Sequence, residues 1–382
     1  MRHFICKTLA QNGAISSYTI YVPWIQTKRF VSSGLNSPEK QSLTVSYLTN
    51  SCGLSLEQAI SASKVVKIGD TEKRDSLLKL FTSYGFTKAQ ISSLVSRHPP
   101  LILARPETTI RPKIEYFRSL GIRGPDLPKI ICSNKSILLA SLEKKIIPNL
   151  DFVKDIVGTN ENLVYALKQS SNVFRRNIKK VMVPNMATLR AHGVPEQHVA
   201  KLVMMQPRSL LLKTDLFKEV VCAIKEMGFE PMRPSFILAV KCMATISKVK
   251  WEKKKEILKS FGWSENEFLS AFRVQPMLMV CSEEKIKDVM DFMINKAGLK
   301  PSDVGRCPNL FLTSMEKRMI PRFAVLQVLM SKGLVRKDRD LIWALNLSKQ
   351  DFEKRFVIQF MEVAPEVINA YQLKIGGDGF SN

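Results

Sequence analysis

Residues 141–150 read SLEKKIIPNL and residues 314–323 read SMEKRMIPRF. Both phrases begin with serine, continue with glutamate and two basic residues, and carry a proline seven positions after the serine. Because serine is a favoured N-cap, Ser141 and Ser314 each predict the beginning of a helix. The proline then stands about two turns inside that helix, where it removes a backbone hydrogen bond and is expected to bend the helix.

Eight glycines recur along the chain with a period of 34 to 37 residues. Each follows a segment with helical periodicity, as in IEYFRSLG and VLQVLMSKG. A glycine just past an amphipathic run is a common C-terminal cap, because it adopts left-handed backbone angles without steric cost. The period therefore predicts a tandem repeat of about 35 residues. The glycines are Gly85, Gly121, Gly158, Gly193, Gly228, Gly262, Gly298 and Gly333.

Prolines keep the same period at two places in the repeat. One set ends a short helical segment and introduces an apolar run such as LIL, MLM or LFL; the other stands inside the next helix. Each repeat is thus predicted to contain helix A, a proline-marked turn, helix B and a glycine. Lys135 and Ser171 replace the turn proline in two repeats, and the repeat near residue 242 lacks both prolines. The turn prolines are Pro99, Pro207, Pro276 and Pro308, and the helix prolines are Pro112, Pro148, Pro184 and Pro321.

These repeats predict an all-α fold, a superhelical solenoid of about 35-residue helical repeats in which each repeat buries its apolar faces on its neighbours. The pattern leaves a right- or left-handed superhelix open. We expect a single solenoid of about nine repeats over residues 39–372 and a flexible C-terminal tail over residues 373–382.

The first 38 residues have the composition of an organelle transit peptide. They contain basic residues, serines and threonines, and no acidic residue precedes Glu39. The run KRFVSSG at 28–34 resembles a mitochondrial processing site. Residues 1–38 therefore predict import into the mitochondrion, with the chloroplast as the alternative because both presequences share this composition.

The chain is strongly basic, with 58 Lys and Arg against 34 Asp and Glu and a formal charge of +24. Such an excess favours a polyanionic partner, although an imported protein can also be merely basic. Seven scattered cysteines without a CxxC pair predict neither a disulfide framework nor a zinc site. The sequence lacks a phosphate-binding loop, an HExxH motif and a nucleophile elbow, so we expect no enzyme, cofactor or metal.

The repeat pattern resembles the mitochondrial transcription termination factor (mTERF) family. Segments such as GFTKAQISSLVSRHPPLIL at 85–103 and RCPNLFLTSMEKRMIPRF at 306–323 carry the likeness, which extends over about residues 41–372. They are similar to the large land-plant branch of the family. The resemblance implies a half-doughnut α-solenoid that acts on organellar DNA or RNA.

Basic residues recur near the beginning of helix B. Counted from the caps at Ser141, Asn177, Ser282 and Ser314, the third position is always lysine. A lysine there opposes the positive end of the helix dipole, whereas a phosphate would favour it. The alternative is that the preceding glutamates, at 143, 284 and 316, satisfy the dipole and pair with neighbouring cations. The fourth position after the cap adds two further cations. The basic residues at the third and fourth positions are Lys144, Lys145, Lys180, Lys285, Lys317 and Arg318.

Two clusters add further candidates. The segment 171–184 places Arg175, Arg176, Lys179 and Lys180 together, either on one helix or with both arginines in the loop before Asn177. The segment 248–263 contains six lysines, among them Lys253 and Lys254, with Trp251 and Trp263 between them. Tryptophan can stack on unpaired bases, but core packing of both rings is the favoured interpretation. Arg322 completes the predicted nucleic-acid-binding set, as a side chain that could reach base edges.

The preferred hypothesis is a nucleic-acid-binding regulator of organellar gene expression, acting in transcription termination or in RNA processing such as intron splicing. Its expected partners are organellar DNA or RNA, together with transcription or splicing proteins. We expect a monomer without a membrane-inserted segment. The alternative is a protein-binding helical-repeat scaffold within an organellar gene-expression complex.

Overall fold

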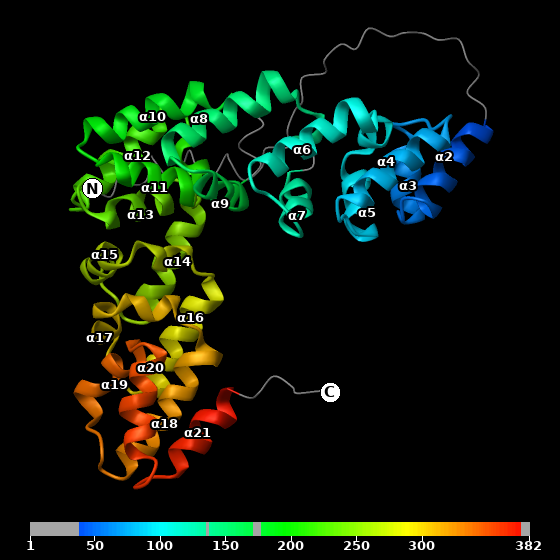
Figure 1. The fold of residues 1–382 in the computed structure, drawn as a ribbon. Coiled ribbons are helices and arrows are strands. Elements are labelled where there is room, and N and C mark those ends of the chain that lie inside the picture. Colours follow the sequence, from blue (N-terminus) through cyan, green and yellow to red (C-terminus); the bar gives the residue numbers. More distant parts are fainter. Residues whose placement is uncertain (1–37, 135–136, 171–176, 376–382) are drawn as a thin grey trace. The chain divides into compact units, whose positions relative to one another are not determined.

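The computed structural model describes residues 38–134, 137–170 and 177–375. These residues form helices joined by short turns and contain no strand (Figure 1), which confirms the predicted all-α helical-repeat fold. The chain divides into two compact units, with the boundary between Lys218 and Glu219 inside helix α12, Thr214–Glu226. Each unit is described separately below.

The N-terminal unit is a stack of helix pairs. Figure 1 shows α6, α8 and α10 in one row and α5, α7, α9 and α11 in a second row. Helix α8 packs on both α9 and α11, so this helix B contacts the helix A of each of the next two repeats. The helices are α2 Pro38–Asn50, α3 Leu56–Ser63, α4 Thr71–Ser83, α5 Lys88–Arg97, α6 Arg111–Ser119, α7 Asp126–Ser133, α8 Ile147–Val157, α9 Asn160–Ser170, α10 Lys179–Ala191 and α11 Glu196–Met205.

The C-terminal unit repeats the same scheme. Helix α14 packs on α16, α15 packs on α17, and α18 packs on α21. Its helices are α13 Pro234–Met243, α14 Lys248–Ser260, α15 Glu265–Val274, α16 Glu283–Asp291, α17 Pro301–Arg306, α18 Ile320–Ser331, α19 Lys337–Asn346, α20 Lys349–Phe352 and α21 Glu366–Ile375.

All eight glycines of the predicted period end a helix B. Their φ angles lie between 69° and 96°, the left-handed region in which a side chain would be strained. At Gly85, for example, the following N–H of Phe86 turns back to donate to the carbonyl of Phe81, which closes the helix end. The predicted caps are therefore confirmed, and they fix the length of each repeat.

The prolines inside helix B stand after a widened turn rather than at a simple bend. Residues Leu142–Ile146 form a π-helical turn, and α8 then begins at Ile147, one residue before Pro148. The Ile147 N–H donates to the carbonyl of Leu142, five residues earlier. Proline lacks an N–H and crowds the carbonyl four residues before it, so one extra residue in the turn accommodates the ring.

The same widened turn precedes two other helix prolines, over Pro106–Ile110 before α6 and over Met315–Met319 before α18. Pro184 is different, because it lies within α10 itself. The expected simple bend is thus corrected at three prolines, where the backbone takes up the proline by a change of hydrogen-bond register.

Five 3₁₀ turns lie between helix A and helix B among the described residues, where the sequence predicted proline-marked apolar turns. They span Pro99–Leu103, Ile137–Leu139, Pro207–Leu211, Pro276–Val280 and Pro308–Leu312. The two apolar residues in the middle of a turn are buried, as with Leu101 and Ile102, neither of which is exposed. The turns thus anchor each repeat in the core of its own unit.

Each of these turns also accepts a hydrogen bond from a side chain of the preceding repeat, which lies in helix B in four cases and is Cys281, directly before the Ser282 cap of α16, in the fifth. The acceptor is always the carbonyl of the residue before the last one of the turn. We call this contact the inter-repeat bond, and it places a polar donor where repeats stack. The bonds are Arg74 Nη1 to Ile102 O at 2.9 Å, Lys113 Nζ to Leu138 O at 2.5 Å, Asn185 Nδ2 to Leu210 O at 2.9 Å, Lys254 Nζ to Met279 O at 2.7 Å and Cys281 Sγ to Phe311 O at 3.2 Å.

Candidate nucleic-acid interface

The predicted serine caps lie at the beginning of helix B, as expected. The hydroxyl oxygens of Ser141, Ser282 and Ser314 each accept a hydrogen bond from the backbone N–H three residues later, at 3.1 to 3.2 Å. Those N–H groups belong to the predicted lysines, Lys144, Lys285 and Lys317. The S-x-x-K spacing therefore fixes a lysine in the first turn of helix B.

One lysine of this kind escaped the sequence analysis. Ser247 caps α14 and accepts from the backbone N–H of Lys250 at 3.4 Å, so Lys250 occupies the same position in its repeat. The signal was present in the letters SKVK, which share the S-x-x-K spacing of SLEK, SEEK and SMEK. The serine was overlooked because this repeat lacks the prolines that mark the others.

The five lysines at these serine-capped helix starts are exposed or half-buried and have no acidic ion-pair partner among the described residues. Lys144, Lys145, Lys250 and Lys317 are exposed, and Lys285 is half-buried. Within the part of the chain that the structure describes, none of the five forms an ion pair. Their charges therefore remain available to an external anion.

The nearby glutamates do not neutralise them. Glu143, Glu284 and Glu316 are exposed and form no ion pair with these lysines in the described residues. The pKa of Glu284 is held below its usual value, first by a hydrogen bond from its own backbone N–H and also by the Ser282 hydroxyl. These carboxylates stabilise the helix start, as the alternative interpretation held, but without pairing with the lysines.

The predicted cluster near residue 177 is described only in part. Arg175 and Arg176 lie outside the described residues. Lys179 and Lys180 are exposed at the beginning of α10, and Lys179 Nζ lies 6.0 Å from the centre of the Phe152 ring. Asn177 is not the cap, because α10 begins after Ile178, and no side chain caps it.

Two predicted interface residues are buried and belong to the stacking contacts instead. Lys254 is 6% exposed and donates to Met279 O, and Arg322 is 1% exposed. The Arg322 guanidinium donates to the carbonyls of Leu345 at 2.9 Å, Leu347 at 2.7 Å and Ser348 at 3.0 Å. A side chain that satisfies buried carbonyls cannot at the same time line an exposed surface, so both predictions were wrong.

Two further predicted cations are engaged within the protein. Lys253 forms an ion pair with Glu283 at 2.6 Å, and this bond raises the pKa of Lys253. Arg318 is half-buried and donates to the carbonyls of Asn346, at 3.3 Å, and Leu347. The position on the helix explains both cases. Consecutive residues of a helix point in different directions, so one cation can face solvent while the next one faces the following repeat.

Both candidate stacking rings are part of the core, in agreement with the favoured interpretation. Trp251 is 1% exposed and packs edge-on against Phe272, with 5.2 Å between ring centres. Trp263 is 2% exposed, and its Nε1–H donates to Pro301 O at 2.9 Å. Neither ring can stack on a base without unfolding its repeat.

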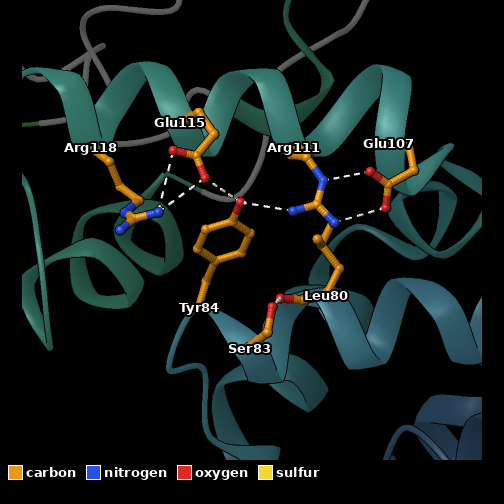
Figure 2. A network of polar contacts seen from close by, with 7 residues as sticks. All are labelled: Leu80, Ser83, Tyr84, Glu107, Arg111, Glu115 and Arg118. Atoms are coloured by element: carbon orange, nitrogen blue, oxygen red, sulfur yellow. Dashed lines mark hydrogen bonds and ion pairs between the residues drawn. The ribbon is translucent and has the colours of Figure 1, made fainter.

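A different surface, on α4 and α6, shows cations that are neutralised (Figure 2). Arg111 binds both carboxylate oxygens of Glu107, with Nε at 2.5 Å from Oε2 and Nη2 at 2.9 Å from Oε1. Arg118 binds Glu115 at 3.0 Å, and the Tyr84 hydroxyl donates to Glu115 and lies 3.3 Å from Arg111 Nη1. The pairing raises the pKa of Arg111 and lowers that of Glu107, so the charges of these two residues compensate each other.

No group of three or more His, Cys, Asp or Glu side chains within the described region of the chain could hold a metal ion. The cysteines in the same region are free thiols. No helix described by the structure is long and apolar enough to span a membrane.

The sequence profile of the mTERF family matches residues 78–240 and 234–353. Together the two matches extend from residue 78 to residue 353, which is 276 of 382 residues. The chain belongs to the mTERF family. A comparison with curated proteins gave no match.

Membership of the mTERF family accounts for the helical repeats and gives the surface a class of ligand. The mTERF proteins are helical-repeat proteins that bind nucleic acids and act in organellar gene expression. The assignment to a land-plant branch stays a prediction. The helix-start lysines, defined as Lys144, Lys145, Lys250, Lys285 and Lys317 together with Lys179 and Lys180, are the accessible cations at the beginning of helix B that could contact such a ligand.

Proposed function

We propose that this mTERF protein binds nucleic acid through its helix-start lysines and thereby regulates expression of an organellar genome. One observation carries the proposal: four helices begin with the same S-x-x-K cap, and each places a lysine where the helix dipole disfavours a cation. A cation kept at an unfavourable position in four repeats is readily explained by a ligand that supplies negative charge.

The chemistry at each site is phosphate binding. A lysine in the first turn adds a full charge to the partial positive charge of the helix N-terminus, and both attract a phosphate oxygen. The release of condensed counterions supplies the free energy, so binding weakens as salt rises. Such contacts fix the strand on the protein but do not read its sequence.

The compartment that fits the sequence is the mitochondrion, with the chloroplast as alternative, because residues 1–38 have the composition of a transit peptide. There the bound protein would stop or release a polymerase, or hold an intron in its active fold. Both roles require a protein that stays on the polynucleotide, and both are compatible with contacts to phosphates.

A salt titration tests the proposal. The purified protein without residues 1–38 would be titrated against fluorescein-labelled RNA and DNA at 50 to 200 mM salt, with anisotropy as the readout. We expect the logarithm of the binding constant to fall linearly with the logarithm of salt, with a slope of about −0.7 to −0.9 per phosphate contacted. A flat response would exclude phosphate contacts and favour the protein-binding scaffold.

A matched pair of variants locates the contacts. Lys144→Ala with Lys145→Ala removes two helix-start lysines, whereas Lys73→Ala with Lys168→Ala removes two lysines whose ion partners, Asp70 and Asp126, lie at 3.0 and 2.7 Å. Both double variants change the net charge equally. We expect only the first to reduce the salt slope, by about 1 per lost contact. Equal losses would assign binding to net charge rather than to these positions.

A further inference from the structure

Each of the 3₁₀ turns between helix A and helix B ends in an aliphatic side chain that is exposed or half-buried. A 3₁₀ helix has three residues per turn, so the second and fifth positions of a five-residue turn share one face. The third and fourth positions face the core, as Leu278 and Met279 do. The second and fifth positions therefore face outward in the same turn.

The two outward positions differ in their composition. The second position varies as a surface position normally does, and is Pro100, Arg208, Met277 or Asn309 in the turns described over all five residues. The fifth position is aliphatic in every one of these turns and in Ile137–Leu139. Its residues are Leu103, Leu139, Leu211, Val280 and Leu312, of which Leu211 is half-buried and the others are 40% to 51% exposed.

Each of these aliphatic residues is followed by a cation. The fifth turn residue stands two positions before the N-cap of helix B, and a basic side chain follows within five positions. The cations are Arg105, Lys144, Lys213, Lys285 and Lys317, and none of them has an ion-pair partner within the described segments. Leu103, Leu139 and Leu211 belong to the N-terminal unit, and Val280 and Leu312 belong to the C-terminal unit.

We propose that these turns bind single-stranded nucleic acid, with the aliphatic side chains against the faces of unpaired bases and the neighbouring cations against phosphates. This inference rests on the proposed function and specifies its ligand. A duplex stacks its base faces inside and offers phosphates and groove edges, so an aliphatic row beside the cations would gain little from it. A single strand exposes both an apolar base face and a phosphate in every nucleotide.

The charge of the turns selects this ligand over an apolar protein surface. A protein that covered Leu139 or Leu312 would also desolvate Lys144 or Lys317, which have no acidic partner to offset the cost. A polynucleotide supplies the apolar face and the negative charge in one repeating unit. The repetition of the pair, aliphatic residue then cation, matches a polymer of identical backbone units.

The test compares one oligonucleotide as a single strand and as a duplex. The double variant Leu139→Gln with Leu312→Gln replaces one turn residue in each unit by a polar side chain of similar size. We expect its dissociation constant for the single strand to rise about fivefold or more, with the duplex constant within about twofold of wild type. A matched control, Ile60→Gln with Ile358→Gln, changes two aliphatic residues outside these turns that are 41% and 60% exposed.

Two further measurements keep the outcomes separate. Leu139→Met with Leu312→Met keeps an apolar side chain at both positions and should bind the single strand as the wild type does. Circular dichroism of the Gln variant shows whether it is folded, so that a loss of binding caused by unfolding is recognised. Equal losses for single strand and duplex, or no loss for either, would overturn the inference. Absence of binding by the wild-type protein to both probes at 50 mM salt would instead overturn the proposed function itself.

Discussion

Two consecutive repeats of the N-terminal unit build the same backbone and present opposite surfaces. Both begin helix B with a π-helical turn, over Pro106–Ile110 and over Leu142–Ile146, and both place a proline two residues after the turn ends. In the first, Arg111 is bound by Glu107 (Figure 2), whereas in the second, Lys144 is exposed without an acidic partner among the described residues. The two repeats place their cations differently, because Arg111 corresponds to Ile147 and Lys144 to Thr108 when Pro112 is aligned with Pro148. The neighbouring acids then decide whether the charge of each cation is available.

A second difference lies within helix B itself. Lys317 is exposed on the first turn, and Arg322, five residues later, is buried against the carbonyls of the next repeat. Both are basic residues in the same phrase, SMEKRMIPRF, but only Lys317 is accessible to an external ligand. A net charge of +24 thus overstates the charge that a ligand can reach.

The largest expected effect concerns the buried member of that pair. Arg322→Ala would remove the donor to the carbonyls of Leu345 and Ser348, would leave the carbonyl of Leu347 to Arg318 alone, and would remove the contact of the guanidinium with the Phe352 ring, 4.7 Å away. We expect a loss of about 3 to 5 kcal/mol in the free energy of unfolding, measured by urea titration. Lys317→Ala, at the exposed position, should change this value by less than about 0.5 kcal/mol.

Similar stabilities of the two variants would contradict the division between buried and exposed cations. The same titration followed by tryptophan fluorescence reports on the C-terminal unit, because Trp251 and Trp263 are buried there. A loss confined to a local transition would place the effect in the repeat that contains Arg322.

The next effect concerns binding by the C-terminal unit. Lys250→Ala with Lys317→Ala removes two helix-start lysines, and we expect the affinity for nucleic acid to fall about tenfold, since each exposed contact contributes about 0.5 to 1 kcal/mol. Stability should be unchanged or slightly higher, because a cation at a helix N-terminus opposes the dipole. The control is Arg233→Ala with Lys349→Ala, whose cations pair with Glu230 at 2.9 Å and Glu353 at 3.8 Å. An equal loss in the control would show that position does not matter.

A smaller effect distinguishes a buried lysine from an exposed one by its pH dependence. Burial lowers the pKa of Lys254, whose surroundings include Cys242, Cys281 and Glu283. The folded state therefore binds the proton less well than the unfolded chain, and raising the pH towards the ordinary lysine pKa should stabilise the wild-type protein. In urea titrations, we therefore expect the wild type to gain free energy of unfolding relative to Lys254→Met between pH 7 and pH 10.

Lys250→Met, at an exposed position of the same helix, is the control for the loss of one lysine. The difference in the free energy of unfolding between the wild type and Lys254→Met could instead stay constant with pH or change in the opposite direction. Either result would mean that burial does not destabilise the ammonium group of Lys254. Burial raises the pKa of the Cys242 and Cys281 thiols as well, but both thiols are present in the wild type and in Lys254→Met, so the comparison of the two proteins isolates the lysine.

The sequence was sufficient for the repeats and insufficient for the side-chain partners. Glycine and serine act through their own backbone and first neighbours, so the caps at Gly85 and Ser141 could be predicted from local letters alone. Lys254 and Arg322 could not be separated from true surface cations, because their acceptors lie 22 to 26 residues away on the next repeat. The π-helical turns were missed for a related reason, since a helix register depends on how the whole helix packs.

The smallest expected effect tests the opening comparison directly, by converting the neutralised repeat into a charged one. Glu107→Gln with Glu115→Gln keeps the shape of both side chains and releases Arg111 and Arg118 from their carboxylates. We expect a two- to threefold increase in affinity for nucleic acid, equivalent to less than about 1 kcal/mol, and a loss of stability of similar size, because exposed ion pairs contribute little. Glu72→Gln with Glu161→Gln, two exposed glutamates of the same unit without an ion pair in the described residues, is the control for added net charge. An increase of equal size in both would mean that binding follows total charge, and no increase in either would mean that this surface lies away from the ligand.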